Sequence, residues 1–328
     1  MKPEYNLGWG DPVVVRQALT EVLEPDAFTY AKVHLATMGY PPHDGNVKLI
    51  EQLKELACRQ SGGRKPKHLF VTCGATGAIN AALYALKTIR TDWVVTDKRY
   101  YPIFPSLIGL SDMIMIDRDK ANFLSNSSNG CVRANFIELV VSPSAPEGLV
   151  FPFHTADIWD AAYASRTYSS KMGHVPEKYR VMCGSLSKTL GLSGLRLGWV
   201  STDEDELANS LRVYTTASYA GISSISMAIA EQVLQDLNLY GFENLSAMYL
   251  NDNREQVQKV LTKFGQSDVP TRGMFAILQL GKPERKALTK ANVKWQPGSS
   301  WGEDDNWARL SLGQSRETVR AAVKAILK

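Results

Sequence analysis

Cysteine is scarce in this sequence, and the few cysteines that occur are far apart. Only four are found in 328 residues, at positions 58, 73, 131 and 183, and none forms a CxxC pair. This spacing excludes a disulfide framework and argues against a zinc site, as is typical of a reducing cytoplasm. We expect no bound metal.

Long apolar runs and an excess of one charge are also missing. No apolar segment approaches the roughly 20 residues of a membrane-spanning helix, and no basic and apolar signal opens the chain. The formal net charge is only +4, and the charges are scattered. Such a balance gives no basis for binding nucleic acid or a membrane surface. The expectation is a soluble, cytoplasmic protein with small-molecule ligands.

Two nucleotide-binding motifs, GxGxxG and GxxxxGK[ST], do not occur, so neither a dinucleotide site nor a P-loop is predicted. A different phosphate signal is present at residues 73–77, where a small-residue turn joins the apolar run 69–72 to a helix. The first N–H groups of such a helix, here those of Ala75 and Thr76, point outward and favour an anion. Taken alone, the turn is weak evidence for a phosphate site and fits an ordinary helix start better.

Lys188 stands in an unusual setting within residues 184–199. No other charged residue lies within seven positions of it, and its neighbours are small, hydroxylated or apolar. An ammonium group loses stability in such surroundings, so its pKa falls and the amine can act as a nucleophile or form a Schiff base. A surface lysine with a buried stem fits the local composition equally well. The choice between a reactive lysine and a surface lysine depends on residues elsewhere in the sequence.

Short apolar runs recur along the chain and alternate with segments long enough for helices. The runs are residues 69–72, 93–96, 113–117, 136–142 and 181–185, and the apolar residues Ile158 and Trp159 precede Asp160 in the same way. This alternation predicts an α/β fold with a mostly parallel sheet, in which ligands gather beyond the carboxyl ends of the strands. A long amphipathic helix over residues 243–264 then leads into a small C-terminal α+β subdomain. Its expected strands and final helix are residues 275–280, 308–312 and 317–327.

The segments that follow the apolar runs carry side chains suited to a ligand site. Tyr100 and Tyr101 offer an aromatic face, and Asp160 and Tyr163 place a carboxylate and a phenol three residues apart. Each of these residues, considered separately, fits core packing or an ion pair. His43 is a loop histidine and a further candidate base, although isolated loop histidines usually have no such role.

A Schiff-base lysine, a phosphate-binding helix start, an aromatic face, a carboxylate and a phenol together resemble the site of fold-type I pyridoxal-phosphate enzymes. Within that group the sequence is most similar to the class I/II aminotransferases. The resemblance runs from Gly10 to about Leu312, and its most specific motif is Ser185-x-x-Lys188 followed by Arg196. It implies pyridoxal 5′-phosphate as the cofactor and a three-layer fold.

The same resemblance implies that the chain is divided into three parts. Residues 1–40 would form an N-terminal segment that closes over the active site. Residues 41–240 would form the large cofactor-binding domain, and residues 241–328 the small C-terminal domain.

Roles toward the cofactor ring follow from the resemblance. Lys188 would form the internal aldimine and later move a proton between the substrate Cα and the cofactor C4′. Asp160 would pair with the pyridine nitrogen, and Tyr163 would hydrogen-bond the phenolic O3′. Tyr101 would stack on the ring, or Tyr100 if the register slips by one residue.

The resemblance also implies the contacts to the cofactor phosphate. They would come from the N–H groups of Ala75 and Thr76, the hydroxyls of Ser185 and Ser187, and the guanidinium of Arg196. A guanidinium matches a phosphate dianion because it can donate two parallel hydrogen bonds.

Three further residues match the substrate side of the family site. Arg309 lies where the family places the arginine that binds the substrate α-carboxylate. Gly10 matches the loop that closes over that carboxylate. Tyr40 matches the tyrosine that reaches the phosphate bound by the neighbouring subunit, so a homodimer with shared active sites is expected.

The chain departs from the family pattern at two places. Residues 145–148 read Ala-Pro-Glu-Gly where the family has Asn-Pro-x-Gly, and Ala145 cannot donate a hydrogen bond to O3′. We expect a more basic O3′ and a raised aldimine pKa, unless Ser144 or another donor substitutes. The chain is also short between residues 280 and 307, which implies a thin small domain.

The leading interpretation is an aminotransferase that moves an amino group from an L-amino acid to a 2-oxo acid. A weaker similarity, carried by the turn at 142–148, the pair Tyr100 and Tyr101, and residues 160–168, is to the alliinase and plant tryptophan aminotransferase branch. A lyase, cyclase or oxidase that uses the same lysine is therefore an alternative interpretation. A non-catalytic binding protein is an alternative of another class, although the intact Lys188 argues against it. The sequence does not identify the substrate.

Overall fold

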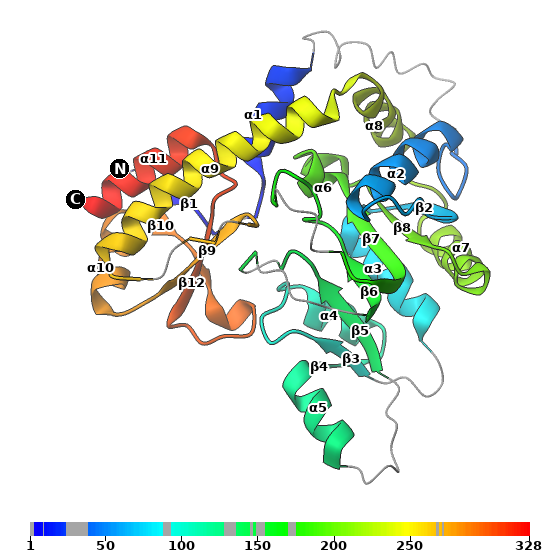
Figure 1. The fold of residues 1–328 in the computed structure, drawn as a ribbon, viewed down its shortest axis with the longest axis horizontal. Helices are drawn as coiled ribbons and strands as arrows, with labels where there is room; N and C mark the ends of the chain where they lie inside the picture. The colour runs from blue at the N-terminus through cyan, green and yellow to red at the C-terminus, as the bar shows by residue number, and fades with distance from the viewer. Residues whose placement is uncertain are drawn as a thin grey trace.

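The structure is a computed structural model that describes residues 3–8, 10–23, 39–87, 93–127, 136–144, 147–148, 155–169, 175–266, 269–270 and 272–328. Its helices and strands form a larger part, built on one wide sheet, and a smaller C-terminal part beside it (Figure 1).

Seven strands form the wide sheet. In spatial order they are β2 (His68–Thr72), β8 (Gly198–Thr202), β7 (Lys178–Ser185), β6 (Thr155–Asp160), β5 (Phe136–Val141), β3 (Trp93–Thr96) and β4 (Ile114–Asp117). Strand β8 runs antiparallel to both of its neighbours, whereas the pairs from β7 to β4 are parallel. The carboxyl-terminal parts of β6 and β7 are buried, which explains their apolar sequence.

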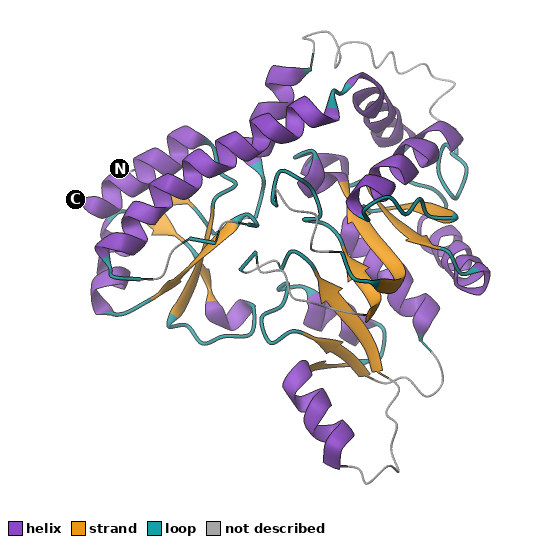
Figure 2. Cartoon of the chain, in the orientation of Figure 1, coloured by secondary structure: helices purple, strands orange, loops and turns teal. Residues whose placement is uncertain are grey.

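Helices flank this sheet (Figure 2). They are α2 (Val47–Gln60), α3 (Gly74–Leu86), α4 (Phe104–Leu110), α5 (Arg118–Ser127), α6 (Leu186–Thr189), α7 (Asp205–Tyr219) and α8 (Ser224–Asp236). Helix α3 packs against β7 and β8 with eight buried residues, most of them alanine, glycine or leucine. Its small side chains allow a close approach to the strands, so its first turn lies at the carboxyl end of β7 and the amino end of the antiparallel β8.

The smaller part contains α9 (Leu239–Lys263), α10 (Lys282–Lys290) and α11 (Arg316–Leu327) beside an antiparallel sheet. The strand order in that sheet is β11 (Gln296–Pro297), β12 (Trp307–Ser311) and β9 (Phe275–Gln279). The N-terminal segment joins this part, because β1 (Tyr5–Asn6) pairs with β10 (Val293–Lys294) and α1 (Val13–Val22) packs against α9. Between β1 and α1, the backbone carbonyl of Gly10 accepts a hydrogen bond from Lys188 of the larger part.

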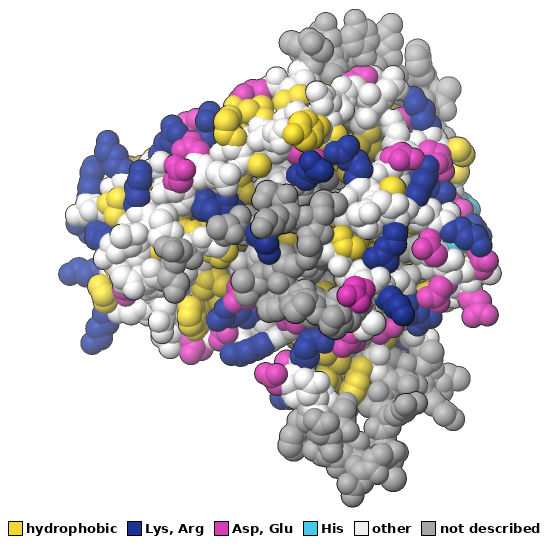
Figure 3. Space-filling model, in the orientation of Figure 1, with side chains coloured by type: hydrophobic (Ala, Val, Ile, Leu, Met, Phe, Trp, Pro, Cys, Tyr) yellow, Lys and Arg dark blue, Asp and Glu magenta, His cyan; other side chains and the backbone are white. Residues whose placement is uncertain are grey.

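The expected fold class is confirmed: a mostly parallel central sheet flanked by helices, with a small antiparallel C-terminal sheet. The predicted strands lie within three residues of the observed bounds, whereas β8 and the two-residue strands were not predicted. Basic and acidic side chains are interspersed on the face drawn in Figure 3. Among the described helices, none is long and apolar enough to cross a membrane.

Candidate active site

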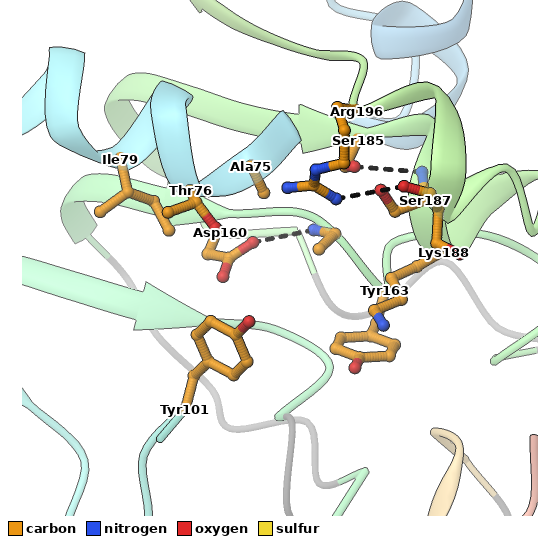
Figure 4. A pocket seen from close by; sticks show the side chains of 12 residues that line it. Ala75, Thr76, Ile79, Tyr101, Asp160, Tyr163, Ser185, Ser187, Lys188 and Arg196 are labelled. Carbon is orange, nitrogen blue, oxygen red and sulfur yellow. Dashed lines mark hydrogen bonds between the residues drawn. The ribbon is translucent and has the colours of Figure 1, made fainter. Parts of the chain in front are cut away.

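A cavity of about 600 Å³ opens where β6 and β7 end and α3 begins. The described residues that line it are Ala75, Thr76, Ile79, Tyr101, Asp160, Ala162, Tyr163, Ser185, Ser187, Lys188, Ser193 and Arg196. Figure 4 shows these side chains arranged around one open space. Every cofactor-side residue predicted from the sequence, except Tyr40, is therefore in this cavity.

Lys188 lies on α6, a single helical turn that directly follows β7. The turn begins at Ser185, whose side chain accepts a hydrogen bond from the Ser187 N–H at 3.1 Å. The Lys188 ε-amine donates to the backbone carbonyl of Gly10, and the Tyr168 hydroxyl donates to the Lys188 carbonyl at 2.8 Å. Burial lowers the pKa of Lys188 to about 8, against an opposing effect of the Asp11 carboxylate. The amine is thus far easier to deprotonate than that of a surface lysine.

One end of the cavity is suited to a phosphate. Gly74, at the start of α3, has a φ of +68°, and a Cβ there would lie 3.0 Å from Nη2 of Arg196. Arg196 donates to the Ser193 carbonyl at 3.2 Å and makes no ion pair with any described carboxylate. The buried hydroxyl oxygen of Ser187 also lacks a hydrogen-bond partner among the described residues. Free donors and a helix N-terminus at one place favour an anion.

Asp160, the last residue of β6, lies at the other end of the cavity. Its Oδ1 accepts a hydrogen bond from the Ala162 N–H at 3.0 Å, and it forms no ion pair with a described residue. Burial raises the pKa of this carboxyl to about 6. A buried carboxylate without a cationic partner is costly, so it favours a protonated nitrogen on a ligand.

Two tyrosines enclose the space between these ends. The ring of Tyr163 packs edge to face against Tyr168 and Phe275, with centroids 5.3 and 6.0 Å away, and burial raises the pKa of its phenol. Tyr101 packs edge to face against Phe104 at 5.6 Å. The cavity thus offers aromatic walls for a flat ring.

A second cavity of about 1010 Å³ adjoins the first. The two share Tyr101, Tyr163, Lys188 and Ser193. The second is also lined by Gly8, Gly10, Asp11, Pro102, Ile103, Phe275, Gln296 and Arg309. The two predicted substrate-side residues, Gly10 and Arg309, are therefore both present.

Arg309 is a buried arginine on β12. Its Cζ lies 3.9 Å from the centroid of the Phe275 ring, and its Nε has no hydrogen-bond partner among the described residues. Burial lowers its pKa to about 10, which still leaves a cation at neutral pH. A Cβ on Gly10 would lie 3.3 Å from Phe275 and 3.8 Å from Nζ of Lys188. Glycine at this position therefore keeps the space beside the lysine open.

Some predicted residues are not in these cavities. Tyr40 is 93% exposed and lines neither of them, and His43 is exposed as well. Ala145 lies outside the described residues, so the expected effect of its missing amide stays a prediction. No group of three or more metal-ligating side chains occurs in the described ranges.

Sequence reasoning missed several residues that line the site, above all Asp11, Ser193 and Gln296. Asp11 accepts hydrogen bonds from Nη2 and Nη1 of Arg16, at 2.8 and 3.2 Å, and from the Ser193 hydroxyl at 2.9 Å. Its position directly after Gly10 was an available signal. Gln296 had none, because it lies in a two-residue strand.

The fold and the two cavities define an α/β protein in which Lys188, whose pKa is lowered by burial, lies between a pocket with free hydrogen-bond donors and a buried arginine. The chain belongs to the aminotransferase class I and II family, whose model matches residues 4–326. The resemblance stated from the sequence is therefore confirmed. Members of this family use pyridoxal phosphate, and the free donors around Arg196 and the unpaired Asp160 fit its phosphate and its ring nitrogen.

Individual proteins that are similar to this chain share a low sequence identity with it. An alliin lyase of Allium cepa var. aggregatum is 26% identical over 62% of this chain and 50% of its own length. Tryptophan aminotransferase-related protein 3 of Arabidopsis thaliana is 22% identical over 78% of this chain and 62% of its own. The chain thus spans about half the length of the curated relatives it matches. An aspartate aminotransferase of Thermotoga maritima has the same fold, with a TM-score of 0.77 and 20% identity over 99% of this chain and 91% of that one.

Proposed function

We propose that this protein is a pyridoxal-phosphate-dependent aminotransferase that moves an amino group from an L-amino acid to a 2-oxo acid. One observation carries the proposal: Lys188 lies in the wall shared by the two cavities, with Arg196 in one and Arg309 in the other. An amine between two anion sites suits a phosphorylated cofactor on one side and a carboxylate substrate on the other.

The cofactor would be held by residues at both ends of the first cavity. Arg196, Ser185, Ser187 and the first N–H groups of α3, those of Ala75 and Thr76, would bind the phosphate. Asp160 would pair with the ring nitrogen, Tyr163 would donate to the phenolic oxygen and Tyr101 would cover the ring. When bound, pyridoxal phosphate supplies an electron sink for the charge left at the substrate Cα.

Lys188 is the group that would move the proton at that carbon. Its lowered pKa leaves a useful fraction of free amine near neutral pH, as a general base requires. Arg309 would hold the substrate carboxylate by two parallel hydrogen bonds, which fixes the direction of the Cα–H bond. Gly10, whose carbonyl accepts from Lys188, would cover the substrate and keep water out.

A second candidate is elimination of a group from the substrate by the same residues. It is favoured by the similarity to alliin lyases, which extends over 62% of the chain for one of them. The two reactions differ in their products: transfer consumes a 2-oxo acid, whereas elimination releases ammonia and a leaving group.

The proposal includes a homodimer and a cytoplasmic location. The described cysteines 58, 73 and 183 are unpaired, in keeping with a reducing compartment.

Support for a dimer comes from exposed apolar side chains. Tyr40 and Val47 are 93% and 74% exposed, and such apolar exposure suits a contact between subunits. Analytical ultracentrifugation of the wild type and a Tyr40→Ser variant tests the dimer; a monomeric wild type contradicts it.

The function is tested by mixing the cofactor-loaded enzyme with 2-oxoglutarate and each L-amino acid in turn. We expect glutamate to appear in step with the oxo acid of one donor, without ammonia. Lys188→Ala should abolish turnover, whereas Lys286→Ala, which removes an exposed lysine on α10, should not. Retained turnover in Lys188→Ala refutes the role of the lysine, and ammonia without glutamate favours elimination.

A further inference from the structure

Gln296 has an unpaired amide in the wall of the second cavity. Its Oε1 is buried and has no hydrogen-bond partner among the described residues, and its Nε2 bonds to none of them either. The side chain nevertheless lines the cavity that contains Lys188 and Arg309. Because buried polar groups are nearly always hydrogen-bonded, an unpaired amide in the wall of a cavity indicates a polar ligand.

The position of Gln296 in the sheet places it beside Arg309. Strands β11 and β12 are antiparallel, and Gln296 is directly opposite Arg309 in their register. Directly opposed residues project from the same face of a sheet, with Cβ atoms about 5 Å apart. The amide and the guanidinium therefore extend into the cavity from neighbouring points.

Both of these neighbours have an unsatisfied polar atom. Nε of Arg309 lacks a partner among the described residues, as Oε1 of Gln296 does, so they are not bonded to each other. Asp11 is the only carboxylate among the described lining residues, and both of its oxygens already accept hydrogen bonds from Arg16. The charge of Arg309 is therefore not neutralised from within the described part of the chain.

A ligand carboxylate satisfies this arrangement. It would accept hydrogen bonds from the guanidinium and from the amide NH₂ at the same time. A half-turn about the last side-chain bond of Gln296 exchanges its oxygen and nitrogen, so either end of the amide can face the ligand. We propose that Gln296 is a substrate-binding residue that, beside Arg309, binds the carboxylate shared by the amino acid and the 2-oxo acid.

This inference rests on the proposed function, because it takes the ligand to be an amino acid or oxo acid. A carboxylate contact differs from a side-chain contact in one measurable way: its loss affects every carboxylate ligand equally. The test therefore uses inert carboxylates that cannot react, and its result does not depend on whether transfer or elimination follows.

The experiment measures binding to the cofactor-loaded enzyme from the absorbance of the cofactor. The probes are hexanoate, 3-phenylpropanoate and 4-carbamoylbutanoate, with 3-phenylpropan-1-ol as the ligand without a carboxylate. Gln296→Met keeps the shape of the side chain but removes the amide. We expect it to raise Kd for all three carboxylates about tenfold and to leave the alcohol unchanged.

Two further variants complete the test. Gln296→Glu has the same shape but adds a negative charge, so it should weaken carboxylate binding more than Gln296→Met. Gln279→Met, at the exposed carboxyl end of β9 and in neither cavity, is the matched control and should bind like the wild type. Three results overturn the proposal. The first is weaker binding of 4-carbamoylbutanoate alone, and the second is binding that weakens as much for the alcohol as for the carboxylates. The third is that both Gln296 variants bind the carboxylates as tightly as the wild type does. A wild type that binds no carboxylate overturns it too, whereas a wild type that binds them but transfers no amino group contradicts only the proposed reaction.

Discussion

Arg16 donates a hydrogen bond to each carboxylate oxygen of Asp11, and Asp11 lies beside the lysine on which the proposed chemistry depends. Arg16 also donates to the Gly191 carbonyl at 2.8 Å, in the loop that follows Lys188. One side chain on α1 thus fastens the N-terminal loop to the lysine loop. These contacts keep the carbonyl of Gly10 in position to accept a hydrogen bond from the ε-amine of Lys188.

We predict that Arg16→Leu loosens this junction. Loss of several charge-assisted hydrogen bonds should lower the free energy of unfolding by about 1–2 kcal/mol, measured by urea denaturation. Arg320→Leu is the control, because Arg320 pairs with Asp252 at an exposed site and such pairs contribute little. Equal losses in the two variants contradict the special position of Arg16. A raised KM for the amino acid is expected in Arg16→Leu alone.

Gly74→Ala should damage the anion pocket directly. The positive φ costs a residue with a Cβ about 1–2 kcal/mol, and the new methyl group would press against the tip of Arg196. We expect weaker binding of pyridoxal phosphate, measured by fluorescence titration of the cofactor-free protein. Gly194→Ala, on the same loop as Arg196, is the control, because no atom lies within 4 Å of its added Cβ. Unchanged cofactor affinity in Gly74→Ala would show that the phosphate is not bound there.

The lowered pKa of Lys188 predicts a pH effect on the cofactor-free protein. Burial brings the pKa from 10.5 to about 8 in the folded state. Between these values the unfolded chain binds more protons than the folded one, so this group makes stability rise with pH in that window. Below pH 8 the buried ammonium destabilises the fold by a constant amount. The carboxyl of Asp160, with a pKa of about 6, has titrated before the window begins.

Urea denaturation at pH 7, 8, 9 and 10 measures this effect. The free energy of unfolding of the wild type should increase relative to that of Lys188→Met from about pH 8 upward. Lys286→Met keeps the buried lysine and should follow the wild type. A constant difference between wild type and Lys188→Met across the four pH values is the result that contradicts the prediction.

Much of the cofactor-side cavity could be predicted because its residues follow strands with a strong local signal. Asp160 and Ser185 end short apolar runs that are typical of buried strands, and the carboxyl ends of parallel strands share one edge. Strand β8 was not predicted, because it begins at Gly198 and ends in polar Ser201 and Thr202. Its strand conformation depends on having β2 and β7 on either side.

The sequence by itself determined the unusual lysine and the fold class, because these depend on residue type and on periodicity over short stretches. The residues proposed to bind the phosphate came from the resemblance to a known family. Only the tertiary structure showed that Asp11, Ser193 and Gln296 line the same site as Lys188. Asp11 meets Ser193 across 182 positions of sequence, and Gln296 meets Arg309 only because two short strands pair in one register. No local pattern encodes such contacts, since each exists only when distant segments have already been packed together.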